Sequence, residues 1–191
     1  MFVTSNTRTT EMEHLTCFLP GLLALGAYTH VDGLKSEQSK RDLATAKALA
    51  YTCYQMYVQM PSGLAADISV VSNRFSQSDC DFKPRIGHEY YTLRPELMES
   101  LFILHHLTRD ETYRYWGWEV FNSIEKHCKA QYGYGRYANV KDDSLEPEDK
   151  MESFFLAETL KYAYLLQDPD HTIDLIDKHV FNTEAHLFKV I

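Results

Sequence analysis

Four short stretches of this chain set charged or hydroxyl-bearing side chains inside otherwise apolar sequence, and this pattern limits how the chain can fold. They are MEHLTCFLPG at 12–21, TLRPELMES at 92–100, KMESFFLAETLKY at 150–162 and FNTEAH at 181–186. An unpaired carboxylate is expensive to bury, so a folded chain pairs it, neutralises it or gives it a metal. The sequence therefore predicts that these stretches contribute to one shared polar site.

Glu158 shows the pattern most clearly. On a helical wheel of ~100° per residue its nearest neighbours are Phe154, Phe155, Tyr162 and Leu165, so the carboxylate lies at the centre of an apolar arc. A surface helix would carry its glutamate on the polar side. Two interpretations remain at this point: a core glutamate satisfied by an arginine or by backbone groups, or a carboxylate of a functional site.

The segment from Thr92 onward repeats the pattern. Pro95 suits the first position of a helix, and Glu96 then falls in the first turn, where the helix dipole stabilises a negative charge. Glu99 follows one turn later, and apolar residues surround the rest of the helix, which predicts burial on both sides. Glu96 could be an ordinary surface residue of the first turn, but Arg94 beside it could also orient a reactive carboxylate.

The stretch FNTEAH differs because it precedes extended chain rather than a helix. Thr183 offers a hydroxyl and a main-chain carbonyl, which are hard oxygen donors of the kind that Ca²⁺ prefers. Glu184 and the helix carboxylates could complete the charge around such an ion through its waters. The same triplet also occurs in ordinary turns, so both interpretations stay open from spacing alone.

Composition narrows the function classes. A chain of 191 residues with 45% hydrophobic content is long enough for one domain with a sizeable core. The net charge of −8 argues against nucleic acid and anionic membrane surfaces as partners. No apolar run approaches the ~20 residues of a membrane span, and the first residues do not read as a signal peptide. The cysteines lack metal-site spacing.

The periodicity predicts an all-α protein. Helices are expected near 14–30, 39–60, 92–107, 110–128 and 149–167, the first of them kinked or divided at Pro20-Gly21. Residues 61–91 read as a long irregular connection, and residues 131–140 as a β-hairpin or an extended loop. Paired helices joined by long loops favour a helical toroid over a four-helix bundle.

Six blocks of the sequence, in this order, resemble glycoside hydrolase family 47, the class I α-1,2-mannosidases. The blocks are MEHLTCFLPG, TCYQMY, LRPE, YWGWEVF, DKMESFFLAETLKY and VFNTEAH. The resemblance identifies 11–191 as the carboxy-terminal portion of the family's catalytic domain, preceded by a disordered tail at 1–10. It implies part of an (α/α)₇ barrel with short β-hairpins. The implied activity is inverting, calcium-dependent hydrolysis of terminal α-1,2-linked mannose from high-mannose N-glycans.

The resemblance also implies roles for individual residues. Glu96 matches the family's general base, which acts on the attacking water. Phe154 matches the aromatic residue that packs against the sugar. The residues implied to bind substrate are His14, Arg94, Glu99, Phe154 and Glu158. Residues 63–67 read Gly-Leu-Ala-Ala-Asp where the family has Gly-Leu-Ser-Pro-Glu, which puts one carboxylate of the pocket in question.

The cofactor implied by the resemblance is Ca²⁺. Thr183 matches its one direct protein ligand, through the hydroxyl and carbonyl oxygens. Glu184 and Glu158 match carboxylates that hold the ion through water.

The resemblance pairs Cys17 with Cys53 in a disulfide, and it leaves Cys80 and Cys128 as free thiols. A disulfide indicates an oxidising compartment, so we expect the lumen of the endoplasmic reticulum or the Golgi. Contact with a membrane is expected only through an anchor that this chain does not include.

The family's general acid lies in the amino-terminal half of its domain, which no block of this chain matches. We therefore expect the chain to supply the base and calcium half of an active site, and the isolated 191 residues to be inactive. The alternative is a catalytically dead fragment or a mannose-binding, lectin-like protein of glycoprotein quality control. Either way, a partial barrel should leave large apolar helix faces uncovered.

Overall fold

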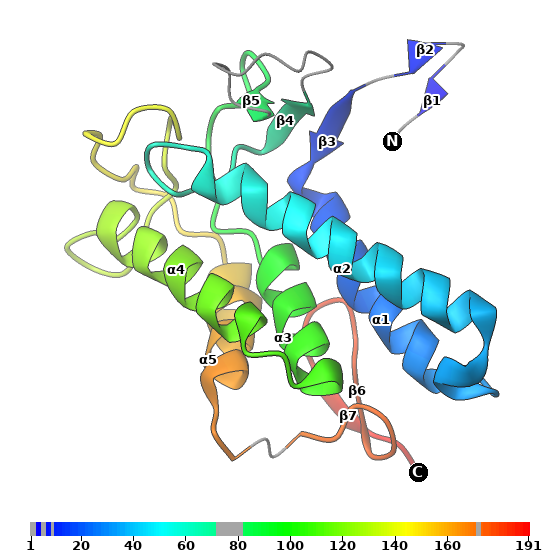
Figure 1. Cartoon of the computed structure of the whole chain (residues 1–191). Coiled ribbons are helices and arrows are strands. Elements are labelled where there is room, and N and C mark those ends of the chain that lie inside the picture. Colours follow the sequence, from blue (N-terminus) through cyan, green and yellow to red (C-terminus); the bar gives the residue numbers. More distant parts are fainter. Residues whose placement is uncertain (1–2, 5–6, 9, 72–81, 171–172) are drawn as a thin grey trace.

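The computed structural model describes residues 3–4, 7–8, 10–71, 82–170 and 173–191. Its described part is mainly helical (Figure 1). The α-helices are α1 Leu19–Thr29, α2 Glu37–Val58, α3 Glu96–Thr108, α4 Thr112–His127 and α5 Leu160–Gln167. Short helical turns precede three of them: η1 His14–Phe18, η2 Gly33–Lys35 and the π-helical turn η3 Phe155–Thr159.

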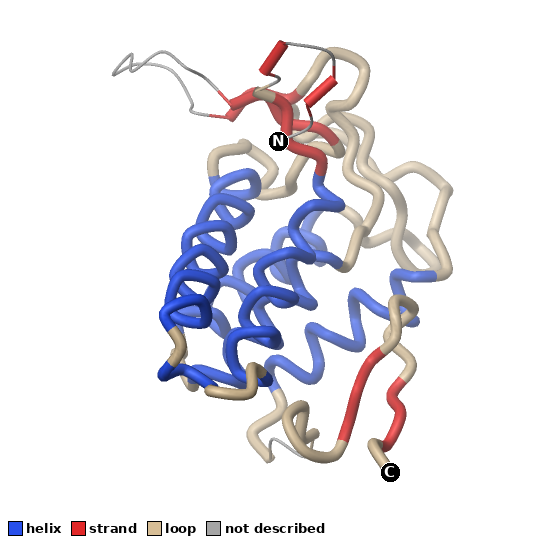
Figure 2. Tube along the Cα trace, turned by 90° about the vertical axis from the view of Figure 1, so that its right-hand side faces the viewer, coloured by secondary structure: helices blue, strands red, loops and turns tan. Residues whose placement is uncertain are grey.

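Helix α3 is the centre of the core. Helices α1, α2, α4 and α5 all contact it. Figure 1 shows it between α4 on one side and α1 and α2 on the other, and Figure 2 shows the helices as one group with the strands at its edges. Nine of its thirteen residues are buried, which agrees with the prediction of a helix that is apolar nearly all round. Since α3 begins at Glu96, the central helix carries that carboxylate into the interior.

The first predicted helix is divided, as its Pro-Gly pair indicated. The 3₁₀ turn η1 passes into α1, which has Pro20 in its first turn. Gly21 lies so close to α3 that an added Cβ would stand 2.9 Å from Ile103 Cδ1. Ser100 of α3 bridges the division: its hydroxyl donates to the Cys17 carbonyl at 2.5 Å and accepts from the Gly21 N–H at 3.0 Å.

The prediction of an irregular connection over 61–91 was wrong in part. Strands β4 Ile68–Val71 and β5 Phe82–Pro84 lie within it, and they form an antiparallel sheet with β3 Glu11–Glu13 in the order β3-β4-β5. Such short strands depend on partners far away in sequence. Two further antiparallel pairs are β1 Val3–Thr4 with β2 Thr7–Arg8, and β6 His179–Phe181 with β7 Leu187–Lys189.

Other boundaries also differ from the predictions. The helix expected from residue 149 begins only at 154, and it opens with a π-helical turn. Residues 131–140 form an extended loop with isolated bridges, which is one of the two predicted alternatives. Parts of the predicted tail at 1–10 lie outside the described residues, so disorder there stays a prediction. No described helix is long and apolar enough to cross a membrane.

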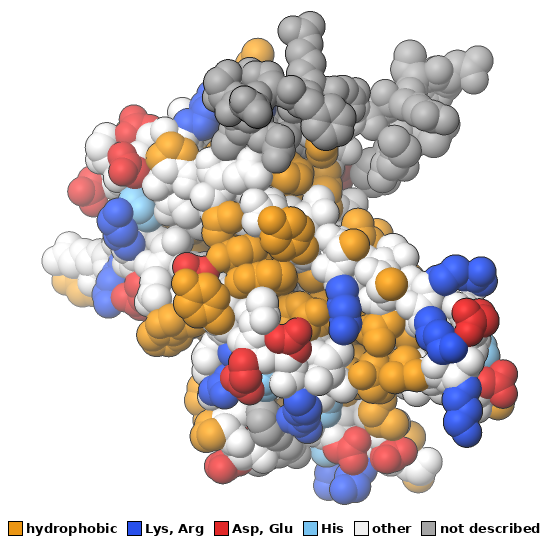
Figure 3. Space-filling view, in the orientation of Figure 1, with side chains coloured by type: hydrophobic (Ala, Val, Ile, Leu, Met, Phe, Trp, Pro, Cys, Tyr) orange, Lys and Arg blue, Asp and Glu red, His pale blue; other side chains and the backbone are white. Residues whose placement is uncertain are grey.

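Large hydrophobic side chains reach the surface at several helices, as predicted for a partial barrel. Figure 3 shows such side chains gathered between α2 and α4. Tyr51 of α2 and Trp118 of α4 are each about half exposed. Leu22 of α1 and Tyr164 of α5 are 53% and 73% exposed.

Candidate active site

Glu96 and His14 form a buried pair. Their side chains approach at 2.8 Å between Glu96 Oε2 and His14 Nδ1, and the two residues are only 9% and 1% exposed. Burial alone would raise the pKa of Glu96. The hydrogen bond from His14 outweighs that effect, with help from a main-chain hydrogen bond and from the charge of Arg94, and holds the pKa below its usual value. Glu96 is therefore not the ordinary surface residue that its sequence position also allowed.

The entrance to α3 is a tightly held bend. Leu93 is fully buried and has a φ of 62°, in the left-handed region that residues with side chains rarely adopt. Thr159 of η3 donates its hydroxyl to the Leu93 carbonyl at 2.6 Å. Backbone strain of this kind persists where the surroundings fix it, and it is frequent at functional sites.

Asp67 supplies a carboxylate at the position where the sequence departs from the family pattern. Arg94 donates its Nε–H to Asp67 Oδ1 at 2.8 Å, and the Tyr90 hydroxyl donates to Oδ2 at 3.1 Å. Burial raises the pKa of Asp67, but the Arg94 hydrogen bond and charge outweigh this and lower it. The shorter side chain thus still holds Arg94, and the Asp67 carbonyl accepts from the His14 backbone N–H at 2.9 Å.

Glu99 and Glu158 stand near Glu96 with too little positive charge around them. Burial, followed by the charges of Glu96 and Glu158, raises the pKa of Glu99 to about 7. Burial also raises the pKa of Glu158, and the charges of Glu184 and Glu96 raise it further. The charge of Lys161 offsets this rise only in part. Glu158 is buried, as its place among apolar neighbours predicted. Its turn is π-helical rather than α-helical, a form common at functional sites.

Thr183 and Glu184 lie in the tight turn between β6 and β7. The Asn182 side-chain oxygen accepts from the backbone N–H groups of Glu184 at 3.0 Å and His186 at 2.8 Å. Ala185 closes the turn with a φ of 55°. Thr183 and Glu184 are both exposed, and within the described part of the chain no hydrogen bond uses the Thr183 hydroxyl. The hydroxyl oxygen of Thr183 is therefore available to a ligand.

The structure brings most of the predicted site residues to one region. Glu99 and Thr183 line the same cavity of about 390 Å³, on α3 and on the β6–β7 turn. His14 contacts Glu96, and Glu158 interacts electrostatically with both Glu96 and Glu184. Phe154 stands half-buried just before η3.

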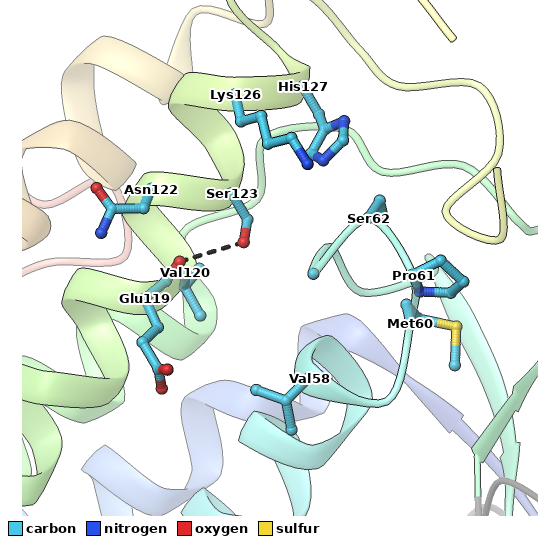
Figure 4. A pocket seen from close by; sticks show the side chains of 11 residues that line it. Val58, Met60, Pro61, Ser62, Glu119, Val120, Asn122, Ser123, Lys126 and His127 are labelled. Carbon is cyan, nitrogen blue, oxygen red and sulfur yellow. Dashed lines mark hydrogen bonds between the residues drawn. The ribbon is translucent and has the colours of Figure 1, made fainter. Parts of the chain in front are cut away.

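A second cavity of about 510 Å³ lies elsewhere, between the end of α2 and α4 (Figure 4). Its polar side chains include Glu119, Ser123, Lys126 and His127, and in Figure 4 Ser123 donates to the Glu119 carbonyl oxygen. None of the predicted site residues lines it.

The donor set suits a hard divalent cation that is bound partly through water. Burial and, after it, the charges of neighbouring carboxylates raise the pKa values of Glu99 and Glu158, and a cation would relieve the repulsion between those charges. The exposed Thr183 oxygens are the kind of ligand that Ca²⁺ accepts. Among the described residues, no three His, Cys, Asp or Glu side chains converge closely enough to ligate a metal directly.

The predicted disulfide is confirmed. Cys17 of η1 and Cys53 of α2 are bonded, with their Cα atoms 5.9 Å apart, and both are fully buried. The bond anchors the turn that carries His14 to a long helix. Cys128 is a free and buried thiol, as predicted, and burial raises its pKa to about 12. The prediction for Cys80 falls outside the described residues.

Three residues at the site escaped the sequence analysis. Tyr57 places its hydroxyl 2.6 Å from His14 Nε2, Thr159 holds the Leu93 carbonyl, and Asn182 builds the turn around Thr183. Tyr57 and Thr159 lie in blocks that carried the resemblance, but nothing in their local sequence marks them. Asn182 had a usable signal, because Asn side chains commonly cap turns of the backbone that follows them.

Comparisons with known proteins show which family the chain resembles. The model of Glycosyl hydrolase family 47 matches residues 2–190. The chain is 45% identical to the mouse endoplasmic reticulum mannosyl-oligosaccharide 1,2-alpha-mannosidase, over 92% of this chain and 26% of that protein. It is 43% identical to a mannosyl-oligosaccharide 1,2-alpha-mannosidase of Arabidopsis thaliana, over 95% of this chain and 30% of the relative.

A solved structure is similar as well. The alpha-1,2-mannosidase from Trichoderma reesei superimposes with a TM-score of 0.83 at 28% identity, covering 99% of this chain and 41% of that one. The chain thus spans between a quarter and a third of the length of the two curated relatives named above. The match of the family model to nearly every residue settles the classification: the chain belongs to glycosyl hydrolase family 47.

Proposed function

We propose that this chain supplies the base and calcium half of the active site of an inverting α-1,2-mannosidase. Its substrate would be the terminal α-1,2-linked mannose of high-mannose N-glycans, as the names of its relatives suggest. In this proposal Glu96 is the general base. An inverting glycosidase needs such a carboxylate on the face of the sugar opposite the leaving group.

The observation that carries the proposal is the buried Glu96–His14 pair beside two carboxylates of raised pKa. Glu96 keeps a lowered pKa and is therefore ionised at neutral pH, as a base must be. Glu99 and Glu158 are held nearby at raised pKa values. A purely structural core would not collect this charge without matching cations.

Thr183 would hold Ca²⁺ directly, and Glu158 and Glu184 would hold it through water. When bound, the ion would contribute positive charge that orients sugar hydroxyls and water. The chain's own residues do the rest in this proposal: Glu96 accepts a proton from the attacking water, and the half-buried ring of Phe154 packs against the sugar. Arg94, held by Asp67, and Glu99 bind hydroxyls of the substrate.

The architecture proposed for the whole domain is an (α/α)₇ barrel, with α1, α3 and α5 among its inner helices. The general acid would come from family sequence that this chain does not match, so we expect the isolated 191 residues not to hydrolyse mannosides. A buried disulfide favours an oxidising compartment, and we propose the lumen of the endoplasmic reticulum or the Golgi.

A chimera tests the proposal. The part of the Trichoderma reesei enzyme that this chain matches would be replaced by residues 11–191, which leaves the remaining part to supply the acid. We expect hydrolysis of a Manα1,2Man disaccharide with inversion at the anomeric carbon. Glu96→Gln should lower the rate by about 10²–10⁴-fold, the usual contribution of a general base.

The exposed Glu146 provides a matched control, since Glu146→Gln makes the same chemical change at a residue outside the predicted site and should leave the rate unchanged. A folded chimera that binds mannose and Ca²⁺ but turns over no substrate would contradict the proposal. That result would favour the lectin-like alternative.

A further inference from the structure

We propose that Tyr57 is a positioning residue, whose hydroxyl donates to His14 Nε2 and thereby keeps the imidazole neutral, with its proton on Nδ1 facing Glu96. The inference deepens the proposed function, because it concerns the partner of the proposed base. It rests on one chain of contacts through the core, from α3 through η1 to α2.

The contacts are short and buried from solvent. Tyr57 Oη lies 2.6 Å from His14 Nε2, and His14 Nδ1 lies 2.8 Å from Glu96 Oε2. Tyr57 and His14 are each 1% exposed, so water does not compete for these groups. The rings meet edge to face, with centroids 5.6 Å apart. Each ring nitrogen of His14 thus has one fixed partner.

The roles of donor and acceptor follow from the chemistry of the partners. An ionised carboxylate only accepts, so His14 Nδ1 must carry a proton and donate it to Glu96. Burial raises the pKa of Tyr57 far above its usual value, so the phenol keeps a proton that it can donate. The lone pair of His14 Nε2 is the acceptor within reach of that proton. Hydrogen bonding at one nitrogen of a histidine fixes what the other one does.

The consequence concerns the strength of the base. A cationic His14 would stabilise the Glu96 carboxylate more strongly and lower its pKa further, and a weaker base transfers protons less well. By occupying the Nε2 lone pair, Tyr57 gives Glu96 a dipolar partner in place of a cationic one. Arg94, Glu99 and Glu158 interact electrostatically with Glu96. Tyr91 packs against His14, with the two ring centroids 6.4 Å apart.

Tyr91 offers a matched control. It is buried in the same place and its ring also meets His14 edge to face, but its hydroxyl interacts with Tyr57 and not with His14. Tyr91→Phe and Tyr57→Phe therefore remove the same atom from neighbouring buried rings, and only the second removes a hydrogen bond to His14.

The experiment is ¹⁵N NMR of the ring nitrogens in the histidine-labelled 191-residue chain at pH 7, with His14 assigned by comparison with His14→Gln. We expect an unprotonated Nε2 and a protonated Nδ1 in the unmutated chain and in Tyr91→Phe. In Tyr57→Phe the Nε2 signal should move to the protonated region. The signal of the unmutated chain tests the proposal even if a variant fails to fold.

A protonated Nε2 in the unmutated chain would overturn the inference, as would an unchanged His14 spectrum in a folded Tyr57→Phe variant. Glu96→Gln gives a second check: a neutral His14 keeps its tautomer opposite the amide oxygen, whereas a cationic one would lose a proton. None of these NMR measurements requires mannosidase activity or Ca²⁺. Failure of the proposed function would therefore be seen separately, in the chimera.

Discussion

Thr159 in the π-helical turn η3 donates its hydroxyl to the carbonyl oxygen of Leu93, 66 residues earlier, at 2.6 Å. Leu93 has left-handed backbone geometry directly before Arg94 and the helix of Glu96. The turn that carries Glu158 is thereby joined to the bend that carries the proposed base. The two proposed site elements hold each other in place without a contact between their carboxylates.

The first prediction follows from that contact. Thr159→Val keeps the shape of the side chain but leaves the buried Leu93 carbonyl without its donor, which should lower the free energy of unfolding by about 1–3 kcal/mol. Thr159→Ser keeps the hydroxyl and should lose less. Urea unfolding followed by circular dichroism measures the difference. Equal midpoints for the valine variant and the unmutated chain would show that the bond contributes nothing.

The second prediction concerns the disulfide. Cys17 and Cys53 close a loop with a sequence separation of 36 residues, for which the chain-entropy estimate is about 4 kcal/mol. The double variant with Ala at both positions should therefore unfold at a clearly lower urea concentration. The unmutated chain under strong reductant is the matched comparison and should approach the variant. A midpoint independent of the disulfide would contradict this account of η1.

The third prediction concerns pH. The pKa of Glu99 is raised to about 7 in the folded chain, above its value of 4.5 when unfolded. Between those values the folded state binds more protons, so stability is fully present below pH 4.5 and is lost as pH rises through 7. Each pKa unit corresponds to about 1.4 kcal/mol. In chelator, Glu99→Gln should therefore be more stable than the unmutated chain at pH 8, and similar at pH 4.

Thermal unfolding at both pH values checks this, with the exposed Glu146→Gln as control. Added Ca²⁺ should reduce the advantage of the Glu99 variant at pH 8, because a bound cation would relieve the carboxylate repulsion. A Glu99→Gln variant that is less stable than the unmutated chain at pH 8 would contradict the charge assignment.

The fourth prediction concerns the shape of the β6–β7 turn, which we propose to bind Ca²⁺, as distinct from the proposed ligand Thr183. Asn182→Ala removes the oxygen that accepts from the N–H groups of Glu184 and His186, so the turn should loosen. We expect weaker Ca²⁺ binding by about tenfold, although Asn182 is not a proposed ligand; the loss of one such hydrogen bond is worth about 1 kcal/mol. Asn182→Asp keeps the acceptor and should bind more tightly than the alanine variant.

Periodicity and burial could be read from the sequence. The five helices were predicted because apolar residues recur at helical spacing, and Glu158 was predicted to be buried because apolar residues flank it on the wheel. The family followed from motif blocks that are long and in order. These features are local, and local features are what a single sequence shows.

What escaped prediction depends on partners far away in the chain. Strand β4 forms because β3 and β5 lie beside it. The sequence of a four-residue stretch does not show which strands it pairs with. The π-helical turn needs i→i+5 bonding, for which the segment carries no distinct pattern. Tyr57 meets His14 across 43 residues, and tyrosine is common in cores, so its hydrogen bond could be seen only in the fold.

The most direct test of the central claim is calorimetric titration of the purified chain with Ca²⁺, compared with Thr183→Ala. Thr45→Ala is the control, since Thr45 is an exposed threonine on α2. We predict binding at about micromolar affinity or tighter, in the range of protein calcium sites, that is lost in the Thr183 variant alone. A folded chain that binds no Ca²⁺, or binds it equally well without the Thr183 hydroxyl, would contradict the proposed calcium half-site.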